Sequence, residues 1–574
     1  MKRRHFIRKS FLACAGLGYL VAKSKVHGAQ LLAKSRHQYD SFVCPELLGR
    51  PTDNSVSIKA IPKDKMEIFF EYGLKSGTLD KKTDTMTIEA GEPAIATLND
   101  LKKDTPYFYK MNYKKFGERN YSEGNEYSFR TQRENDERFT FAIQSDPHHD
   151  DVTNYDTYKN CIINIGKDNP DFLIDIGDTS MAEKLAKTFD EQVARNLLAR
   201  KYFDEICHSI PLFMGIGNHD GENGWRYKGN ETDSAVVLTK IRKKHFLNPQ
   251  PNDFYTGDKT DHKFIGLREN YYAWNWGNAL FVVLDPYWYT KKNKAWGWSL
   301  GKVQYDWFNK ILEESKATFK FVFCHHLVGG LDLNGVARGG IEAAPFFEWG
   351  GKNADGTEGF EKNRPGWGKP IHEVMVDNKV SAFFHGHDHF YCQQELDGII
   401  YQLMPQPSIA KYDKVNNAKE YGYVNGKVIP NSGYLRGTIS KTEAKFEYVR
   451  AYHEENPGKG WVNGKVEETY TIKGNCRIAT VNKNQSQSFR LNVHENKKCF
   501  TINFSIPTAQ NVQISIYDLA GREIRKIANQ QYKSGNNLVQ WDGKVNNNSK
   551  IVKGIYLCRM KVGESVKSLR FLKR

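Results

Sequence analysis

The motif Gly217-Asn218-His219-Asp220 combines three side chains that are useful in hydrolytic chemistry. It follows the apolar run 211–216, a pattern typical of a buried strand that ends in a loop. The Asn218 amide can offer an oxygen to a metal ion, the His219 imidazole can donate a proton, and the Asp220 carboxylate can orient that imidazole. For this motif alone, a polar turn that closes a strand is an equally good interpretation.

Four more short motifs follow apolar runs in the same way. They contain Asp146 with His148, Gly177 with Asp178, His325 with His326, and His387 with His389. Since the carboxyl ends of parallel strands meet at one edge of a sheet, five strands would deliver Asp, Asn and His side chains to one place. These residue types are metal ligands, and the sequence therefore predicts a metal centre at that edge.

The elements that would position these motifs alternate along the chain. Between the motifs, helices are predicted at 158–165, 182–207 and 303–315, because apolar residues recur there with helical spacing. Strands that alternate with helices predict sheets covered by helices, in an α/β or α+β domain that spans residues 139–450.

Taken in order, the five motifs D-x-H, GD, GNHD, H and GHxH resemble the calcineurin-like metallophosphoesterase superfamily. The resemblance implies a two-sheet αββα sandwich that holds two divalent or trivalent metal ions, which would be Fe, Zn or Mn. It also implies a ligand set. Asp146, His148 and His389 would hold one ion, Asn218, His325 and His387 would hold the other, and Asp178 would bridge both.

The same resemblance implies hydrolysis of phosphate monoesters, in small molecules or macromolecules, by a metal-bound hydroxide. His219 would protonate the leaving group, with Asp220 as its orienting partner. His326 could contact the substrate or be a buried structural histidine. One alternative is a phosphodiesterase, which would have the same metal core and a cleft for a second ester substituent. Another is a non-catalytic surface-binding protein, but that alternative predicts lost ligands, and all seven are present.

With the domain that precedes it, this region resembles the purple acid phosphatases, with one departure. Their metal-bound tyrosine, three residues after the bridging aspartate, is replaced by Met181, so their colour is not expected here. Long loops at the same edge would set substrate specificity. Arg226 and Arg338 could clamp phosphate oxygens, and Trp296 or Trp298 could stack on a leaving group, although surface or packing roles are the simpler interpretation.

The N-terminal part predicts an export signal and an all-β domain. Residues 1–28 have a basic start followed by the uncharged stretch 11–22, which is too short for a comfortable membrane span, and are predicted to be a twin-arginine-like signal peptide. Alternating segments at 40–132 predict a β-sandwich. Within it, residues 101–107 resemble the tyrosine-corner segment of fibronectin type III domains.

The C-terminal part predicts a second β-sandwich, at 485–574, after a connecting segment at 451–484. Tyr517-Asp-Leu-Ala-Gly-Arg522, Trp541-Asp-Gly-Lys544 and Gly554-Ile-Tyr556 resemble the sorting domain of type IX secretion cargo. That resemblance implies the export machinery as a partner, and a generic immunoglobulin-like module is the alternative. The mature protein is expected to be secreted or attached to the cell surface, or otherwise periplasmic, without a transmembrane span.

The charge and the cysteine content argue against several other classes of protein. The formal charge is +16, but no block of Lys and Arg with interleaved aromatic residues predicts a nucleic-acid groove. The nine cysteines are scattered and include no CxxC pair, which argues against a zinc knuckle or a thioredoxin-like dithiol. Disulfides are possible in an exported protein.

Overall fold

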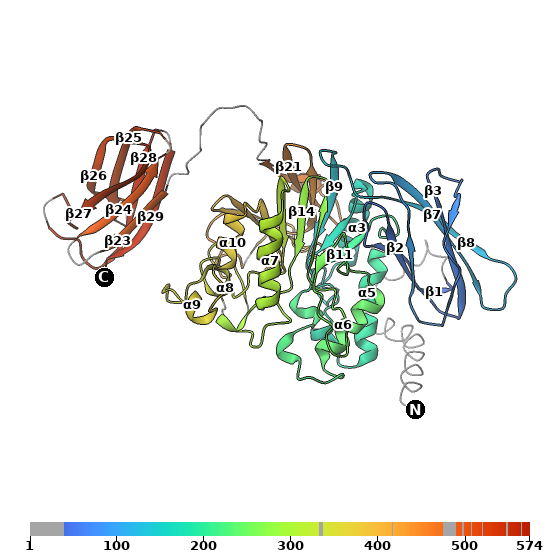
Figure 1. Ribbon diagram of the computed structural model, residues 1–574. Helices are drawn as coiled ribbons and strands as arrows, with labels where there is room; N and C mark the ends of the chain where they lie inside the picture. Colours follow the sequence, from blue (N-terminus) through green and yellow to red (C-terminus); the bar gives the residue numbers. More distant parts are fainter. Residues whose placement is uncertain are drawn as a thin grey trace. The chain divides into compact units, whose positions relative to one another are not determined.

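The structure is a computed structural model, and it divides the chain into two compact units, Met1–Cys476 and Arg477–Arg574 (Figure 1). It describes residues 40–331, 337–415, 417–474, 490–495, 499–506, 508–518, 521–546, 549–563 and 565–573. The predicted signal peptide at 1–28 lies outside the described residues. In the part of the chain that is described, no helix is long and apolar enough to cross a membrane.

Two sheets form the centre of the first unit. Their strand orders are β11-β10-β9-β20-β21-β22 and β12-β13-β14-β15-β16-β18-β17-β19. The first contains β9 (Phe139–Gln144), β10 (Leu173–Asp175), β11 (Leu212–Met214), β20 (Gly433–Ile439), β21 (Glu443–Arg450) and β22 (Val466–Lys473). The second contains β12 (Thr256–Gly257), β13 (Tyr272–Trp276), β14 (Ala279–Val283), β15 (Phe319–Phe323), β16 (Ala382–His385), β17 (Tyr391–Leu396), β18 (Ile399–Leu403) and β19 (Lys427–Ile429).

The strands that precede the five motifs pair in parallel with one another within each sheet. β10 pairs with β9 and β11 in parallel, and β14, β15, β16 and β18 form a parallel run in the second sheet. Phe141 and Ile143 face the core between the two sheets, while Ala142 faces the opposite side. Because both faces are covered, these strands are continuous apolar runs in the sequence.

Helices cover the outer face of each sheet, which gives the αββα order of layers that the sequence predicts and confirms the fold class. α3 (Tyr155–Asp168) and α5 (Phe189–Phe203) pack on the first sheet, and α7 (Lys302–Glu314) and α10 (Ile371–Asp377) pack on the second. The other helices and 3-10 turns among the described residues are α4 (Ala182–Leu185), α6 (Ser234–His245), α8 (Phe347–Gly350), α9 (Phe360–Asn363), η2 (Asn218–Asp220), η3 (Gly224–Arg226), η4 (Ala295–Gly297) and η5 (Pro457–Lys459).

Two elements differ from the sequence prediction. The helix predicted at 182–207 is divided into α4 and α5, because Thr188 and Glu191 form a capping box that starts a new helix. The Thr188 hydroxyl accepts the Glu191 N–H at 3.2 Å, and the Glu191 carboxylate accepts the Thr188 N–H at 2.9 Å. In addition, β22 lies within the predicted connecting segment and adds an antiparallel edge strand next to β21.

The N-terminal β-sandwich belongs to the first unit and forms hydrogen bonds with the two-sheet domain of that unit. One sheet contains β1 (Phe42–Gly49), β2 (Val56–Pro62) and β6 (Ala94–Leu98), and the other contains β3 (Met66–Gly73), β4 (Lys81–Lys82), β5 (Met86–Ile88), β7 (Pro106–Lys115) and β8 (Ser122–Arg130). Buried Lys59 donates to the carbonyls of Lys243 and Phe246, both at 2.5 Å, and the Tyr109 hydroxyl donates to the His208 carbonyl at 2.6 Å. The sandwich therefore supports α6 and the segment that follows α5.

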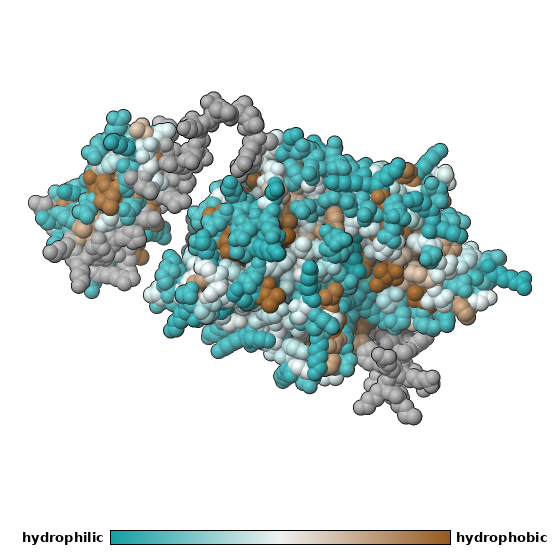
Figure 2. Space-filling view, viewed as in Figure 1, coloured by the Kyte–Doolittle hydropathy of each residue, from teal (hydrophilic) through white to brown (hydrophobic). Residues whose placement is uncertain are grey.

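The second unit is a β-sandwich with its own core. Its sheets contain β23 (Arg490–Glu495), β24 (Phe500–Ile506) and β27 (Gly535–Trp541), and β25 (Gln510–Tyr517), β26 (Glu523–Tyr532), β28 (Gly554–Val562) and β29 (Ser565–Lys573). Ile502, Ile514 and Cys558 are fully buried in that core. Figure 2 shows one face of the whole chain, on which the coloured residues are mostly hydrophilic and the apolar patches are small and separate.

Candidate metal centre

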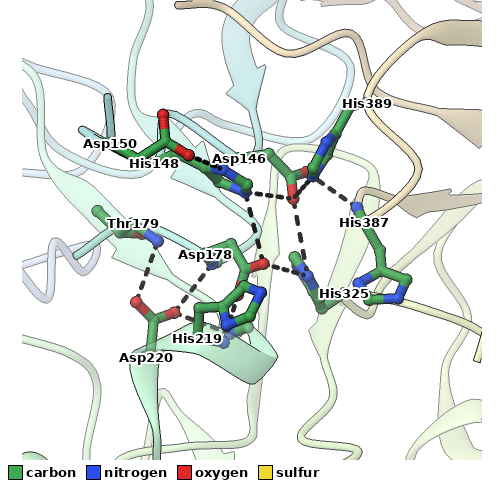
Figure 3. Close-up of polar contacts among 12 residues, drawn as sticks. Asp146, His148, Asp150, Asp178, Thr179, His219, Asp220, His325, His387 and His389 are labelled. Atoms are coloured by element: carbon green, nitrogen blue, oxygen red, sulfur yellow. Dashed lines mark hydrogen bonds and ion pairs between the residues drawn. The ribbon is translucent and has the colours of Figure 1, made fainter. Parts of the chain in front are cut away.

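The loops that follow β9, β10, β11, β15 and β16 carry the five motifs. Since these strands are parallel neighbours within their sheets, their carboxyl ends open on one side of the sandwich. Asp146, Asp178 and Asn218 come from the first sheet, and His325 and His387 come from the second. The two sheets thus supply opposite sides of one site (Figure 3).

The predicted ligands form two adjacent groups. Asp146, His148 and His389 make one, Asp178, His325 and His387 make the other, and within each group the ligand atoms lie within 4.8 Å of one another. Asp178 lies between them, because its Oδ2 is 3.6 Å from His148 Nε2 and 3.4 Å from His325 Nε2. This is the position that a bridging carboxylate requires.

Several atoms that face this site have no hydrogen-bond partner among the described residues although they are buried. They are Asp146 Oδ1, His148 Nε2, Asn218 Oδ1, His325 Nε2 and His387 Nε2. Unpaired buried polar atoms are costly, and their gathering at one point indicates a ligand that satisfies them. Imidazole, carboxylate and amide donors suit Fe, Zn or Mn, so the residues fit metal ions of this kind.

Contacts behind two of the imidazoles fix the nitrogen that faces the site. His148 Nδ1 lies 3.2 Å from Asp150 Oδ2, and His325 Nδ1 lies 3.1 Å from the Ile176 carbonyl oxygen. Because each partner is an acceptor, Nδ1 is the donor and Nε2 is left with a lone pair toward the site. Asp150 is a residue that the sequence analysis missed, since nothing in its spacing marks it.

The loops adopt a backbone that few residues other than glycine tolerate. Five predicted ligands have positive φ angles: Asp146 (60°), His148 (59°), Asp178 (52°), His387 (75°) and His389 (66°). Hydrogen bonds from two of the predicted ligands join the loops to one another. Asp146 Oδ2 accepts the His387 N–H at 2.9 Å, and Asp178 Oδ1 accepts the His219 N–H at 2.7 Å. Such strain at a site persists only where the surroundings hold it.

Two motif glycines are explained by this close approach of the loops. A Cβ at Gly217 would lie 2.0 Å from the Asp178 nitrogen, and a Cβ at Gly386 would lie 2.0 Å from Ser145 Oγ. Any side chain at either position would therefore push one metal-binding loop away from another.

The carboxylates and imidazoles of the site shift the pKa values of Asp178 and His325 more strongly than burial does. Burial alone would raise the pKa of Asp178, but neighbouring histidines, first His325, hold it well below its ordinary value. Burial would lower the pKa of His325, but Asp178 and Asp146 raise it to about 9. Since metal ions bind the neutral imidazole, binding is expected to release protons from the site.

The partner of His219 is Glu183, which corrects the prediction that Asp220 orients it. His219 Nδ1 lies 3.1 Å from Glu183 Oε2, and the other Glu183 oxygen accepts from Arg226. Burial alone would raise the pKa of Glu183, but His219 and Arg226 lower it below its ordinary value. Glu183 is thus an anion at the back of the imidazole, where it can stabilise the protonated ring.

Asp220 instead connects two loops of the site. Its carboxylate accepts the N–H groups of Asp178 and Gly217, both at 2.9 Å, and of Thr179 and Ser180, both at 3.0 Å (Figure 3). Asp220 follows His219 directly in a 3-10 turn, and side chains of adjacent helical residues point in different directions. It therefore positions the Asp178 loop and does not touch the His219 side chain.

Replacing Asp220 with asparagine should therefore destabilise the first unit. The amide keeps the shape of the side chain but turns one acceptor into a donor that faces backbone N–H groups. We expect a loss of about 1–3 kcal/mol of unfolding free energy, measured by urea denaturation of the metal-free protein. Asp190→Asn, at an exposed site on α5, is the control. A stability equal to that of the control would contradict the structural role of Asp220.

The Glu183→Gln variant tests the contact with His219. Glutamine can keep a hydrogen bond but cannot stabilise an imidazolium ion electrostatically, so the kcat of a reaction that uses His219 as its acid should fall about 10- to 100-fold. Arg226→Met removes the other partner of Glu183 and leaves the His219 contact in place, and its effect on kcat should be smaller. Equal kcat values for Glu183→Gln and the unaltered protein would rule out a role for this contact.

His326 and the two tryptophans named as possible substrate contacts are held by neighbouring side chains and backbone. His326 is buried, its Nδ1 donates to the Leu327 carbonyl at 2.7 Å, and its ring lies beside His387 with centroids 5.3 Å apart. Burial and the neighbouring His325 charge lower the pKa of His326 to about 3. Trp298 is buried against His326, and Trp296 bonds Asn353 and packs on Phe347, so both tryptophans have packing roles.

Comparisons with known proteins agree with this site. Residues 139–391 match the sequence model of the calcineurin-like phosphoesterase family, and residues 491–565 match that of the FlgD Ig-like domain. The chain therefore contains a calcineurin-like metallophosphoesterase domain, followed by an Ig-like domain. The type IX sorting resemblance has no support from these matches. No curated protein matches the chain in sequence.

Solved structures show the same fold at low identity. The chain is similar to purple acid phosphatase PPD1 from yellow lupin (Lupinus luteus) seeds, with 16% identity and a TM-score of 0.52, over 75% of this chain and 74% of that one. It is also similar to PhoD, with 14% identity and a TM-score of 0.55, over 76% of this chain and 90% of that one. At these identities the likeness concerns the fold.

Proposed function

We propose that the protein is a dinuclear metal-dependent phosphatase that hydrolyses phosphate monoesters. The observation that carries the proposal is the set of buried ligand atoms that have no hydrogen-bond partner among the described residues and that converge from both sheets around Asp178. The match to the calcineurin-like phosphoesterase family supports the reaction class. Fe, Zn and Mn are the ions that the donor set favours.

In this proposal Asp146, His148 and His389 would hold one ion, Asn218, His325 and His387 would hold the other, and Asp178 would touch both. Bound there, the ions would supply an acidified water and would neutralise the phosphate oxygens. His219 would give its proton to the leaving oxygen through Nε2, because Nδ1 is engaged by Glu183. Glu183 would stabilise the charged imidazole before the transfer.

Steady-state turnover of a chromogenic monoester and its diester analogue tests this proposal. The purified chain, reconstituted with Fe, Zn or Mn, should hydrolyse the monoester with the higher kcat/KM. A preference for the diester would keep the metal site and make the protein a phosphodiesterase. Absence of turnover on both esters with every metal would support a non-catalytic binding protein on this scaffold.

We also propose that the chain is exported and that the second unit serves as an address for the export machinery. The support is its separate core and the resemblance of residues 517–522, 541–544 and 554–556 to sorting domains, together with the basic and uncharged residues at 1–28. Deleting residues 485–574 should then leave kcat/KM of the purified protein within about twofold, since all proposed ligands lie in the first unit. A folded but inactive truncation would contradict the assignment.

A further inference from the structure

Arg338 is tied to the turn that carries two of the proposed ligands. Its Nη1 donates to Asp388 Oδ1 at 2.8 Å and to the His387 carbonyl at 3.4 Å. Asp388 is itself fixed, because its Oδ2 accepts the Gly339 N–H at 2.9 Å and the Tyr423 hydroxyl at 2.8 Å. The guanidinium is thus held directly beside the metal-binding turn.

Two nitrogens of this guanidinium, Nε and Nη2, have no acceptor among the residues that the structure describes, and 22% of the side chain is exposed. The guanidinium carbon lies 3.9 Å from the centre of the Tyr421 ring, which fixes the plane of the group. Nε and Nη2 form one edge of the guanidinium and present two parallel N–H groups, the geometry that recognises two oxygens of a phosphate or carboxylate.

We propose that Arg338 binds two terminal oxygens of the substrate phosphate and thereby selects monoesters over diesters. This inference rests on the proposed function of the same site. A monoester phosphate has three terminal oxygens and up to two negative charges near neutral pH, whereas a diester has two such oxygens and one charge. A fixed guanidinium beside the turn of His387 would therefore gain more from the monoester, because the monoester brings the greater negative charge.

The competing explanation is structural, because Arg338 also neutralises the buried carboxylate of Asp388. A double-mutant cycle with Arg338→Met, Asp388→Asn and both changes together separates the two roles. If Arg338 only compensates Asp388, its replacement should have little further effect in the Asp388→Asn background. If it binds substrate, the loss should persist in that background.

The readouts are binding of inorganic phosphate to the metal-loaded protein by calorimetry, metal content, and kcat/KM for a monoester and a diester. Arg338→Met should weaken phosphate binding and lower monoester kcat/KM by about tenfold or more in both backgrounds, because charge-assisted hydrogen bonds are lost. Diester kcat/KM should fall by less than about threefold, and metal content should not change.

Arg364→Met is the matched control. Arg364 also pairs with a buried carboxylate, that of Glu348, and lies over the rings of Trp296 and Trp367, but it contacts none of the proposed ligands in the described part of the chain. Its loss should leave phosphate binding within about twofold. Equal losses on both esters, no loss in the Asp388→Asn background, or no phosphate binding by the unaltered protein would overturn the inference. Absence of turnover in the unaltered protein while phosphate binding still depends on Arg338 would instead refute the proposed function alone.

Discussion

Replacing Asp178 with asparagine is expected to lower the metal content and to remove almost all turnover. Asp178 Oδ2 lies within 3.6 Å of one ligand from each group, and its Oδ1 holds the backbone of His219. The amide offers one neutral oxygen in place of a bridging anion, so it cannot neutralise two cations. We expect kcat/KM to fall by at least about a thousandfold, equal to about 4 kcal/mol of barrier, with loss of one or both ions.

Asp190→Asn makes the same chemical change at an exposed position on α5 and should retain full activity and metal content. Elemental analysis and ester turnover on the same preparations give the result. If Asp178→Asn kept two ions and full kcat/KM, the bridging position assigned to Asp178 would be wrong.

His219→Ala is expected to reduce kcat by about 10²- to 10⁴-fold while both ions remain bound, because a general acid is lost and no ligand is removed. The reduction should depend on the leaving group. An alkyl phosphate, whose alkoxide needs a proton to leave, should lose more than a nitrophenyl phosphate, whose phenolate is already stable. Rates for a series of leaving groups provide the measurement.

His372→Ala is the control for His219→Ala. His372 lies on α10 and contacts Tyr401 and Asp397, away from the proposed ligands, so its loss should not change kcat. An equal loss of kcat on both leaving groups in His219→Ala, or a parallel loss of metal, would show that His219 does not act as the proton donor.

The sequence predicts much of this fold because the strands that precede the proposed ligands pair in parallel and are buried. β9 and β15 are buried on both faces, so they stand out as apolar runs, and the ligand residues follow them within a few positions. The glycines of the GNHD and GHxH motifs are required for a physical reason. Gly217 and Gly386 lie against the backbone or side chain of another loop, which leaves no room for a Cβ.

The residues that the sequence does not predict act through contacts between distant segments. Glu183 reaches His219 from the start of α4, and neither its spacing nor its type distinguishes it from the other surface acids around it. The prediction that Asp220 orients His219 is wrong for a related reason. Adjacency in the chain suggested a contact with His219, but the direction of its side chain within the 3-10 turn takes it to the Asp178 loop.

Metal content per chain, measured by mass spectrometry on the purified protein and on Asp178→Asn, tests the central claim most directly. The arrangement of ligands around Asp178 predicts about two ions of Fe, Zn or Mn per chain in the unaltered protein and fewer in the variant. A content of one ion or none after reconstitution, or the same content in both proteins, would contradict a dinuclear centre bridged by Asp178.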